Sequence, residues 1–136
     1  MLSPKLVPEL SVSDFRQSLG FYTEILGFSI EYQRVEEGFA CLSFGDAQIM
    51  IDQIDIGRTW KTGAFDFPLG RGINLQIEVS QLELLLQKLI KHKIKLFFEP
   101  EEKWYQKKDM QVGHRQFAVQ DPDGYLLRFF ENIGVK

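Results

Sequence analysis

Alternating apolar and polar residues open each half of the chain. They run through residues 6–12 and again through residues 73–79, and a period of two predicts half-buried strands. Ser13 and Ser80 follow these strands, and each is suited to cap a helix, because apolar residues then recur at helical spacing. The two serines lie 67 residues apart, as do the strands before them. This repeat indicates a duplication and two copies of a strand followed by a helix.

Short apolar runs separated by turn residues follow each predicted helix and predict three further strands per half. The runs are residues 28–35, 39–44 and 47–54 in the first half, and 94–98, about 110–119 and 125–131 in the second. The charged segment 99–109 has little apolar support and is predicted as a loop. The chain therefore reads as a single α+β domain, residues 1–136, built of two βαβββ repeats at about 5–54 and 72–131, joined by a loop at 55–71.

Alternation also places a mixed and mostly polar set of residues together on the sheet face away from the helices. The set comprises Val7, Glu9, Ser11, Gln48, Met50, Asp52, Asn74, Gln76, Glu78 and Arg128. Both halves carry polar groups at equivalent offsets, so two strands present them in register. The face is either ordinary solvated surface or the wall of a ligand cleft.

The candidate ligand-binding side chains on that face differ in their chemistry. The carboxylates of Glu9, Asp52 and Glu78 would attract a cationic ligand and speed its association. The amides of Asn74 and Gln76 offer both donors and acceptors, which suits them to orient a polar ligand.

Five further residues complete the candidate binding set. Arg128 is a site-shaping group or a member of a structural ion pair. Trp104, Tyr105 and, in the central loop, Trp60 either anchor their segments on the core or stack on a ligand. His114, near the start of a predicted strand, is a candidate to line the cleft.

Composition narrows the class of protein. The 136 residues include 16 Lys and Arg against 19 Asp and Glu, and the net charge of −3 argues against a nucleic-acid binder. No apolar run is long enough for a membrane span or a signal peptide, and the lone Cys41 suits a reducing compartment, so we expect a cytoplasmic protein without membrane or nucleic-acid partners. No nucleophile motif or phosphate-binding glycine loop is present in the sequence.

Three segments carry a resemblance to a known family. They are Val7-Pro8-Glu9-Leu10, residues 21–28 (FYTEILGF) and residues 116–129 (QFAVQDPDGYLLRF). Together they resemble the vicinal oxygen chelate superfamily, which contains glyoxalase I, extradiol dioxygenases and the bleomycin-resistance proteins. The resemblance covers nearly the whole chain and implies the glyoxalase/bleomycin-resistance fold, in which curved mixed sheets carry their helices on the outer face.

The resemblance also implies where a metal would bind. The enzymes of the superfamily hold a divalent metal with His and Glu on the opening and closing strands of each half, which correspond here to Val7, Met50, Asn74 and Arg128. None of these is a competent ligand for such an ion. His92 lies in a basic cluster ending a helix, where a cation complements the helix dipole, and one further histidine makes no metal site. We therefore expect no metal, no cofactor and no catalytic residue.

The bleomycin-resistance branch is the best remaining match, and its members resemble one another in carrying Arg at the position of Arg128. They are not enzymes. The resemblance implies a homodimer whose clefts sequester a large cationic glycopeptide antibiotic between acidic and aromatic side chains. The chain departs from the branch at Val112-Gly113-His114, where relatives tend to carry Trp-Gly. Two alternatives stay open, namely a metal-dependent enzyme with non-standard ligands and a domain whose aromatic loop binds a protein partner.

Overall fold

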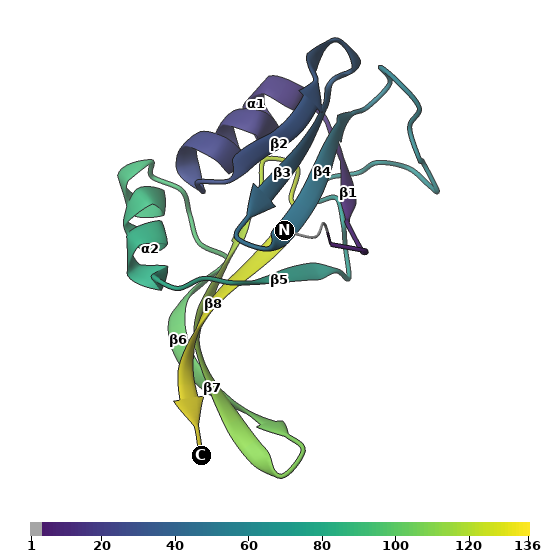
Figure 1. Ribbon diagram of the computed structural model, residues 1–136. Helices are drawn as coiled ribbons and strands as arrows, with labels where there is room; N and C mark the ends of the chain where they lie inside the picture. The colour runs from purple at the N-terminus through teal and green to yellow at the C-terminus, as the bar shows by residue number, and fades with distance from the viewer. Residues whose placement is uncertain (1–3) are drawn as a thin grey trace. The chain divides into compact units, whose positions relative to one another are not determined.

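The computed structural model describes residues 4–136, and the chain divides into two compact units between Phe67 and Pro68. The division falls within the segment that the sequence predicts as a connecting loop. Each unit holds a four-stranded mixed sheet and one α-helix (Figure 1). This arrangement confirms the predicted α+β fold with its repeated βαβββ order.

The first unit runs in the order strand, helix and three strands. Its elements are β1 (Glu9–Val12), α1 (Phe15–Gly20), a π-helical turn (Phe21–Ile25), β2 (Ser29–Arg34), a 3-10 turn (Val35–Glu37), β3 (Phe39–Phe44) and β4 (Ala47–Gln53). The strands are ordered β1-β4-β3-β2. β1 pairs parallel to β4, and the other pairs are antiparallel. The edge strands of this sheet, β1 and β2, are therefore the strands that precede and follow the helical segment in the sequence.

The second unit repeats this topology. Its elements are β5 (Asn74–Glu78), α2 (Leu82–Lys91), β6 (Phe98–Lys107), β7 (Met110–Gln120) and β8 (Leu126–Val135). The strands are ordered β5-β8-β7-β6, with β5 parallel to β8 and the other pairs antiparallel. Figure 1 shows β6, β7 and β8 as long, strongly curved strands.

The prediction that Ser13 and Ser80 cap the helices is wrong. Asp14 caps α1 instead, and its Oδ1 accepts a hydrogen bond from the backbone N–H of Gln17 at 3.1 Å. α2 begins after Gln81, whose side chain makes no capping hydrogen bond. The cap therefore lies one residue later than the sequence pattern suggests in both copies.

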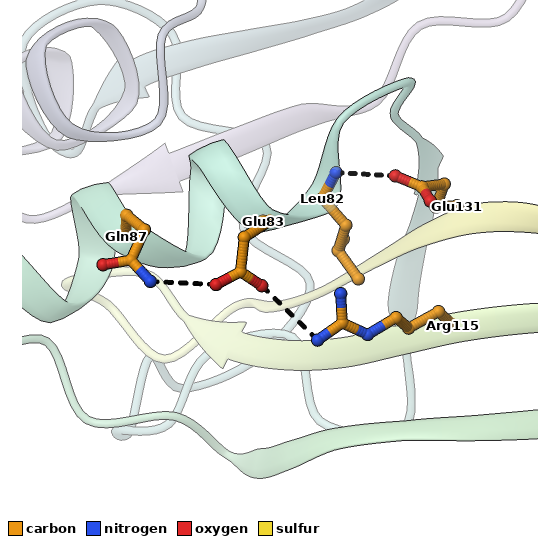
Figure 2. A network of polar contacts seen from close by, with 5 residues as sticks. All are labelled: Leu82, Glu83, Gln87, Arg115 and Glu131. Carbon is orange, nitrogen blue, oxygen red and sulfur yellow. Dashed lines mark hydrogen bonds and ion pairs between the residues drawn. The ribbon is translucent and has the colours of Figure 1, made fainter.

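The first N–H of each helix is bound by a side chain from the last strand of the same unit. The N–H of Phe15 donates to Oε1 of Gln53 on β4 at 2.6 Å, and the N–H of Leu82 donates to Oε1 of Glu131 on β8 at 2.9 Å (Figure 2). The first backbone N–H groups of a helix have no acceptor inside the helix, so each of these side-chain oxygens supplies the hydrogen-bond partner that the N–H would otherwise lack. Each helix is thereby tied to the strand that closes its sheet.

The segment predicted as a charged loop is a strand. β6 occupies residues 98–107, whereas residues 94–97, predicted to be extended, form no strand. β6 is the edge strand of its sheet, and most of its side chains are exposed, so it lacks the apolar alternation of a half-buried strand. Its pairing comes from backbone bonds to β7 and from cross-strand neighbours of opposite charge such as Glu102 and Arg115.

The core of each unit consists of the apolar residues that the pattern assigns to the helix side. The largest fully buried ones include Val12, Tyr22, Leu26, Leu42 and Ile51 in the first unit, and Leu82, Leu89, Phe117, Leu127 and Phe129 in the second. Cys41 is buried as well. Leu6, an apolar residue of the alternating stretch 6–12, lies outside the core, because β1 begins only at Glu9 and the Leu6 side chain is 83% exposed.

Candidate functional site

The first unit contains a cavity of about 310 Å³ on the sheet face that carries the predicted polar residues. Its lining includes the carboxylates of Glu9 and Asp52, and a third, that of Glu37, which is paired with Arg34. Three aromatic rings, those of Tyr32, Phe39 and Trp60, also line it. Glu9 and Asp52 come from β1 and β4, Tyr32 and Phe39 from β2 and β3, and Trp60 from the loop after β4. The cavity thus combines negative charge with flat apolar surfaces.

Glu9 and Asp52 share a side-chain hydrogen bond across the parallel strands β1 and β4. The pKa of Glu9 is raised by its partial burial first, and then by the hydrogen bond to Asp52 and the charge of that residue, while the charge of Arg34 acts in the opposite direction. A hydrogen bond between two carboxyl groups requires a proton on one of them. The pair can therefore hold a proton, or release it and accept a cation.

Two arginines of the first unit lie flat against cavity rings. The guanidinium carbon of Arg34 is 4.0 Å from the centre of the Phe39 ring, and its Nε lies 3.2 Å from Oε1 of Glu37. The guanidinium carbon of Arg58 is 3.9 Å from the centre of the Trp60 ring. Both distances are those of cation–π contacts.

In the second unit, a hydrogen-bonded chain spans the sheet face opposite α2. Arg128 on β8 donates from Nε to Oδ1 of Asn74 at 3.1 Å and from Nη1 to Oε1 of Gln116 at 3.3 Å. Nε2 of Gln116 donates to the Tyr105 hydroxyl at 2.6 Å. These three bonds join four side chains, and the two that involve Arg128 hold its guanidinium in one orientation.

His114 lies beside this chain between two aromatic rings. Its imidazole stacks on Phe130 with centroids 4.0 Å apart, and the Tyr105 ring lies 5.3 Å away. Its Nδ1 is buried without a hydrogen-bond partner among the described residues. Burial is the main cause that lowers the pKa of His114, the charge of Arg128 adds to it, and Glu78 opposes it. The imidazole is therefore neutral at neutral pH.

The remaining predicted residues of the second unit separate into two groups. Gln76 and Glu78 are exposed on β5, beside Arg128 and Phe130 on β8, which places them with the open-face residues. Trp104 pairs with Gly113 on β7, and Gly113 lies two residues before Arg115, whose side chain reaches Glu83 on α2. Because residues two apart on a strand share a face, Trp104 lies on the α2 side of the sheet.

The Trp104 ring packs closely over Gly113, where an added Cβ would lie 2.7 Å from two ring carbons, and the Lys136 ammonium lies 4.1 Å from the ring centre. The tryptophan therefore anchors the β6–β7 hairpin on that side of the sheet. A ligand contact by Trp104 stays a prediction, and so do the ligand contacts of the other candidate residues.

Several residues that belong to these two faces were not predicted from the sequence. Gln116 is 3% exposed and connects Tyr105 to Arg128, and its position two residues after His114 on one strand is the signal that could have identified it. Tyr32 and Arg34 likewise alternate on one strand of the first unit. The stacking of Arg58 on Trp60 has no comparable signal, because both lie in a loop without periodicity.

The positions that correspond to metal ligands in related enzymes do not fit a metal. In the first unit they hold the aliphatic Val7 and the thioether of Met50. In the second unit, Oδ1 of Asn74 accepts a hydrogen bond from Arg128, whose permanent charge would repel a cation. Among residues 4–136, no group of three or more His, Cys, Asp and Glu side chains is placed to hold a metal ion.

Two sheet units of βαβββ order, each with polar residues on the sheet face away from its helix, define a duplicated α+β fold. The model of the Glyoxalase/Bleomycin resistance protein/Dioxygenase superfamily matches residues 6–129, so the chain belongs to that superfamily. It is 32% identical to proteins named "Bleomycin resistance protein" from Geobacillus stearothermophilus and Staphylococcus aureus, with 93% of this chain and 96% of each relative covered.

Solved structures agree on the fold. TioX from Micromonospora sp. ML1 superposes with a TM-score of 0.71 at 18% identity, covering 96% of this chain and all of that one (100%). A virulence protein from Salmonella typhimurium superposes with a TM-score of 0.69 at 21% identity, covering 98% and 100%. Within the part of the chain that the structure describes, no helix has the length and apolar character needed to cross a membrane.

Proposed function

We propose that this chain is a metal-free, non-catalytic binding protein of the bleomycin-resistance type. It sequesters a cationic aromatic or glycopeptide antibiotic, works as a homodimer in the cytoplasm, and protects by stoichiometric capture. The antibiotic class rests on the relatives named "Bleomycin resistance protein", which align over nearly the full length of both chains.

The observation that carries the proposal is the cavity of the first unit. It places the Glu9–Asp52 pair among the rings of Tyr32, Phe39 and Trp60. A cation that also has a flat aromatic part gains Coulomb attraction from the carboxylates and stacking from the rings, so both features of the ligand are used. An uncharged ligand gains the ring contacts but not the Coulomb attraction of the carboxylates.

The chemistry of the second unit supports binding over metal-dependent catalysis. Arg128 lies at the position where related enzymes have a metal-binding Glu, and two hydrogen bonds, to Asn74 and Gln116, hold its guanidinium in place. This arrangement is built for polar contacts to an organic ligand. A protein of this kind needs neither a cofactor nor a nucleophile.

A bleomycin titration tests the proposal, followed by calorimetry and by tryptophan fluorescence. We expect one site per chain and quenching that persists in Trp104→Phe but is lost in Trp60→Phe, since Trp60 lines the cavity. Asp52→Asn should weaken binding by about tenfold or more, because a hydrogen bond to a charged group is worth about 1.5–3 kcal/mol. Asp46→Asn is the matched control, because Asp46 lies in the β3–β4 turn outside the cavity.

Two results would contradict the proposal. A titration with neither heat nor quenching removes bleomycin as a ligand. A stoichiometric divalent ion in protein purified without chelator, detected by elemental analysis, instead supports the metal-dependent enzyme. Light scattering at several concentrations tests the homodimer independently of any ligand.

A further inference from the structure

The cavity of the first unit already holds two planar cations of its own. Each of two cavity rings is covered by a guanidinium group, Phe39 by Arg34 at 4.0 Å and Trp60 by Arg58 at 3.9 Å. A ring face is attractive to a cation because of its quadrupole, and only one cation fits on one face. The two rings are thus occupied by the kind of group that the cavity would recognise in a ligand.

The two arginines differ in how firmly they are held. Arg34 belongs to strand β2, and its Nε bonds Glu37 at 3.2 Å, so two contacts fix it on Phe39. Arg58 lies in the loop after β4 and has no ion pair among residues 4–136. The Trp60 ring is itself 58% exposed. Arg58 can therefore leave its ring at the cost of a single exposed contact.

The cavity charge favours a cation in that place. Neither Glu9 nor Asp52 forms a salt bridge within the described residues 4–136, although both line the cavity together with Arg58. A ligand cation that reaches the carboxylates neutralises this pair, whereas Arg58, which lies over the Trp60 ring, forms a salt bridge with neither of them among residues 4–136. Exchange of one cation for another on Trp60 is consequently favourable when the incoming group also reaches the carboxylates.

We propose that Arg58 is a built-in competitor that occupies the Trp60 face until a planar organic cation of the guanidinium or amidinium class displaces it. The proposal rests on the proposed function of cation capture by the cavity and adds the class of group that is recognised and the residue that limits affinity. In the free protein, Arg58 covers an exposed tryptophan. In the complex, the ligand cation lies on Trp60 and Arg58 moves into solvent.

The test uses benzamidinium and its neutral isostere benzamide, in a Trp104→Phe background that leaves Trp60 as the single tryptophan reporter. We expect benzamidinium to quench Trp60 and benzamide to bind more weakly. Arg58→Gln should tighten benzamidinium by about two- to fivefold, the factor that loss of one exposed cation–π competitor gives. Arg58→Lys, which keeps a competing cation, should stay near the parent affinity.

Lys61→Gln is the matched control. It removes the same charge from the same loop, but Lys61 lies over Phe65 at 5.4 Å and does not line the cavity. Equal affinities in Arg58→Gln and Lys61→Gln would overturn the proposal, because the effect would then be one of net charge. Weaker binding in Arg58→Gln would also overturn it, since Arg58 would be a ligand contact, and so would equal binding of benzamidinium and benzamide.

The outcome stays separable from that of the proposed function. If the chain binds bleomycin but Arg58→Gln leaves the affinities for benzamidinium and benzamide unchanged, the competitor role fails and antibiotic capture stands. If bleomycin does not bind while Arg58→Gln tightens benzamidinium, the antibiotic assignment fails and the competitor role stands.

Discussion

Glu131 links the end of the second sheet to the start of α2, and its replacement by alanine should destabilise the second unit. Its Oε1 accepts the N–H of Leu82 at 2.9 Å, and Leu82 is fully buried. Figure 2 shows this bond beside a second contact, in which Arg115 on β7 reaches Glu83 of α2. Both contacts join α2 to the sheet, the first to β8 and the second to β7, and only the first is partly buried.

The expected magnitudes separate the variants. Glu131→Ala leaves a buried N–H without an acceptor, which costs about 1–3 kcal/mol. Glu131→Gln retains an acceptor and loses only the charge near the helix N-terminus, worth about 0.3–1 kcal/mol. Arg115→Gln breaks an exposed ion pair at 3.4 Å, with both side chains at least a third exposed, and should cost no more than about 0.5 kcal/mol.

Urea unfolding followed by circular dichroism measures these differences as shifts of the midpoint at constant slope. The expected order of destabilisation is Glu131→Ala, then Glu131→Gln, then Arg115→Gln. Thermal midpoints should follow the same order, with roughly 4 °C per kcal/mol for a chain of this size. If Glu131→Ala costs no more than Arg115→Gln, the Leu82 N–H finds another acceptor and the reasoning about this cap is refuted.

Four further predictions concern the open faces and the hairpin. Because the pKa of Glu9 is raised, a ligand cation must displace a proton from this carboxyl group at low pH. Calorimetry should therefore show that the affinity for the cation falls as the pH drops through that pKa, and the Glu9→Gln variant should lack this dependence. The pKa of His114 is lowered, so its NMR titration should fall below the usual range and move upward in Arg128→Gln, which removes one of the two lowering causes. Protonation of His114 should also remove stability as pH falls through its lowered pKa, measurable as a falling urea midpoint. Gly113→Ala should cost about 1–3 kcal/mol and change Trp104 fluorescence, because its Cβ would meet the ring at 2.7 Å; an unchanged urea midpoint would contradict this packing.

The fold was largely predictable because its signals are local. Period-two alternation identified β1 and β5, which the 67-residue repeat relates to each other, and short apolar runs between turn residues identified β2, β3, β4, β7 and β8. β6 was missed because an edge strand with exposed side chains on both faces has no alternation to detect.

The site was predictable in part for the same reason. Alternation placed Glu9 and Asp52 on one face, and the structure brings them into hydrogen-bond contact. The same rule, applied one step further along β7, would have added Gln116. The Arg58–Trp60 contact depends on the path of a loop, and no sequence period fixes that path.

The side chains that bind the helix starts also constrain the order of folding. The backbone N–H of Phe15 binds Gln53, 38 residues later in the chain, and that of Leu82 binds Glu131, 49 residues later. Each helix can form its first turn early, but its N-terminal donor gains a partner only after the last strand of the unit has docked in register. During synthesis, α2 therefore leaves the ribosome long before the residue that completes it. The arrival of β8 is then the step at which the helix and sheet of the second unit become one cooperative structure.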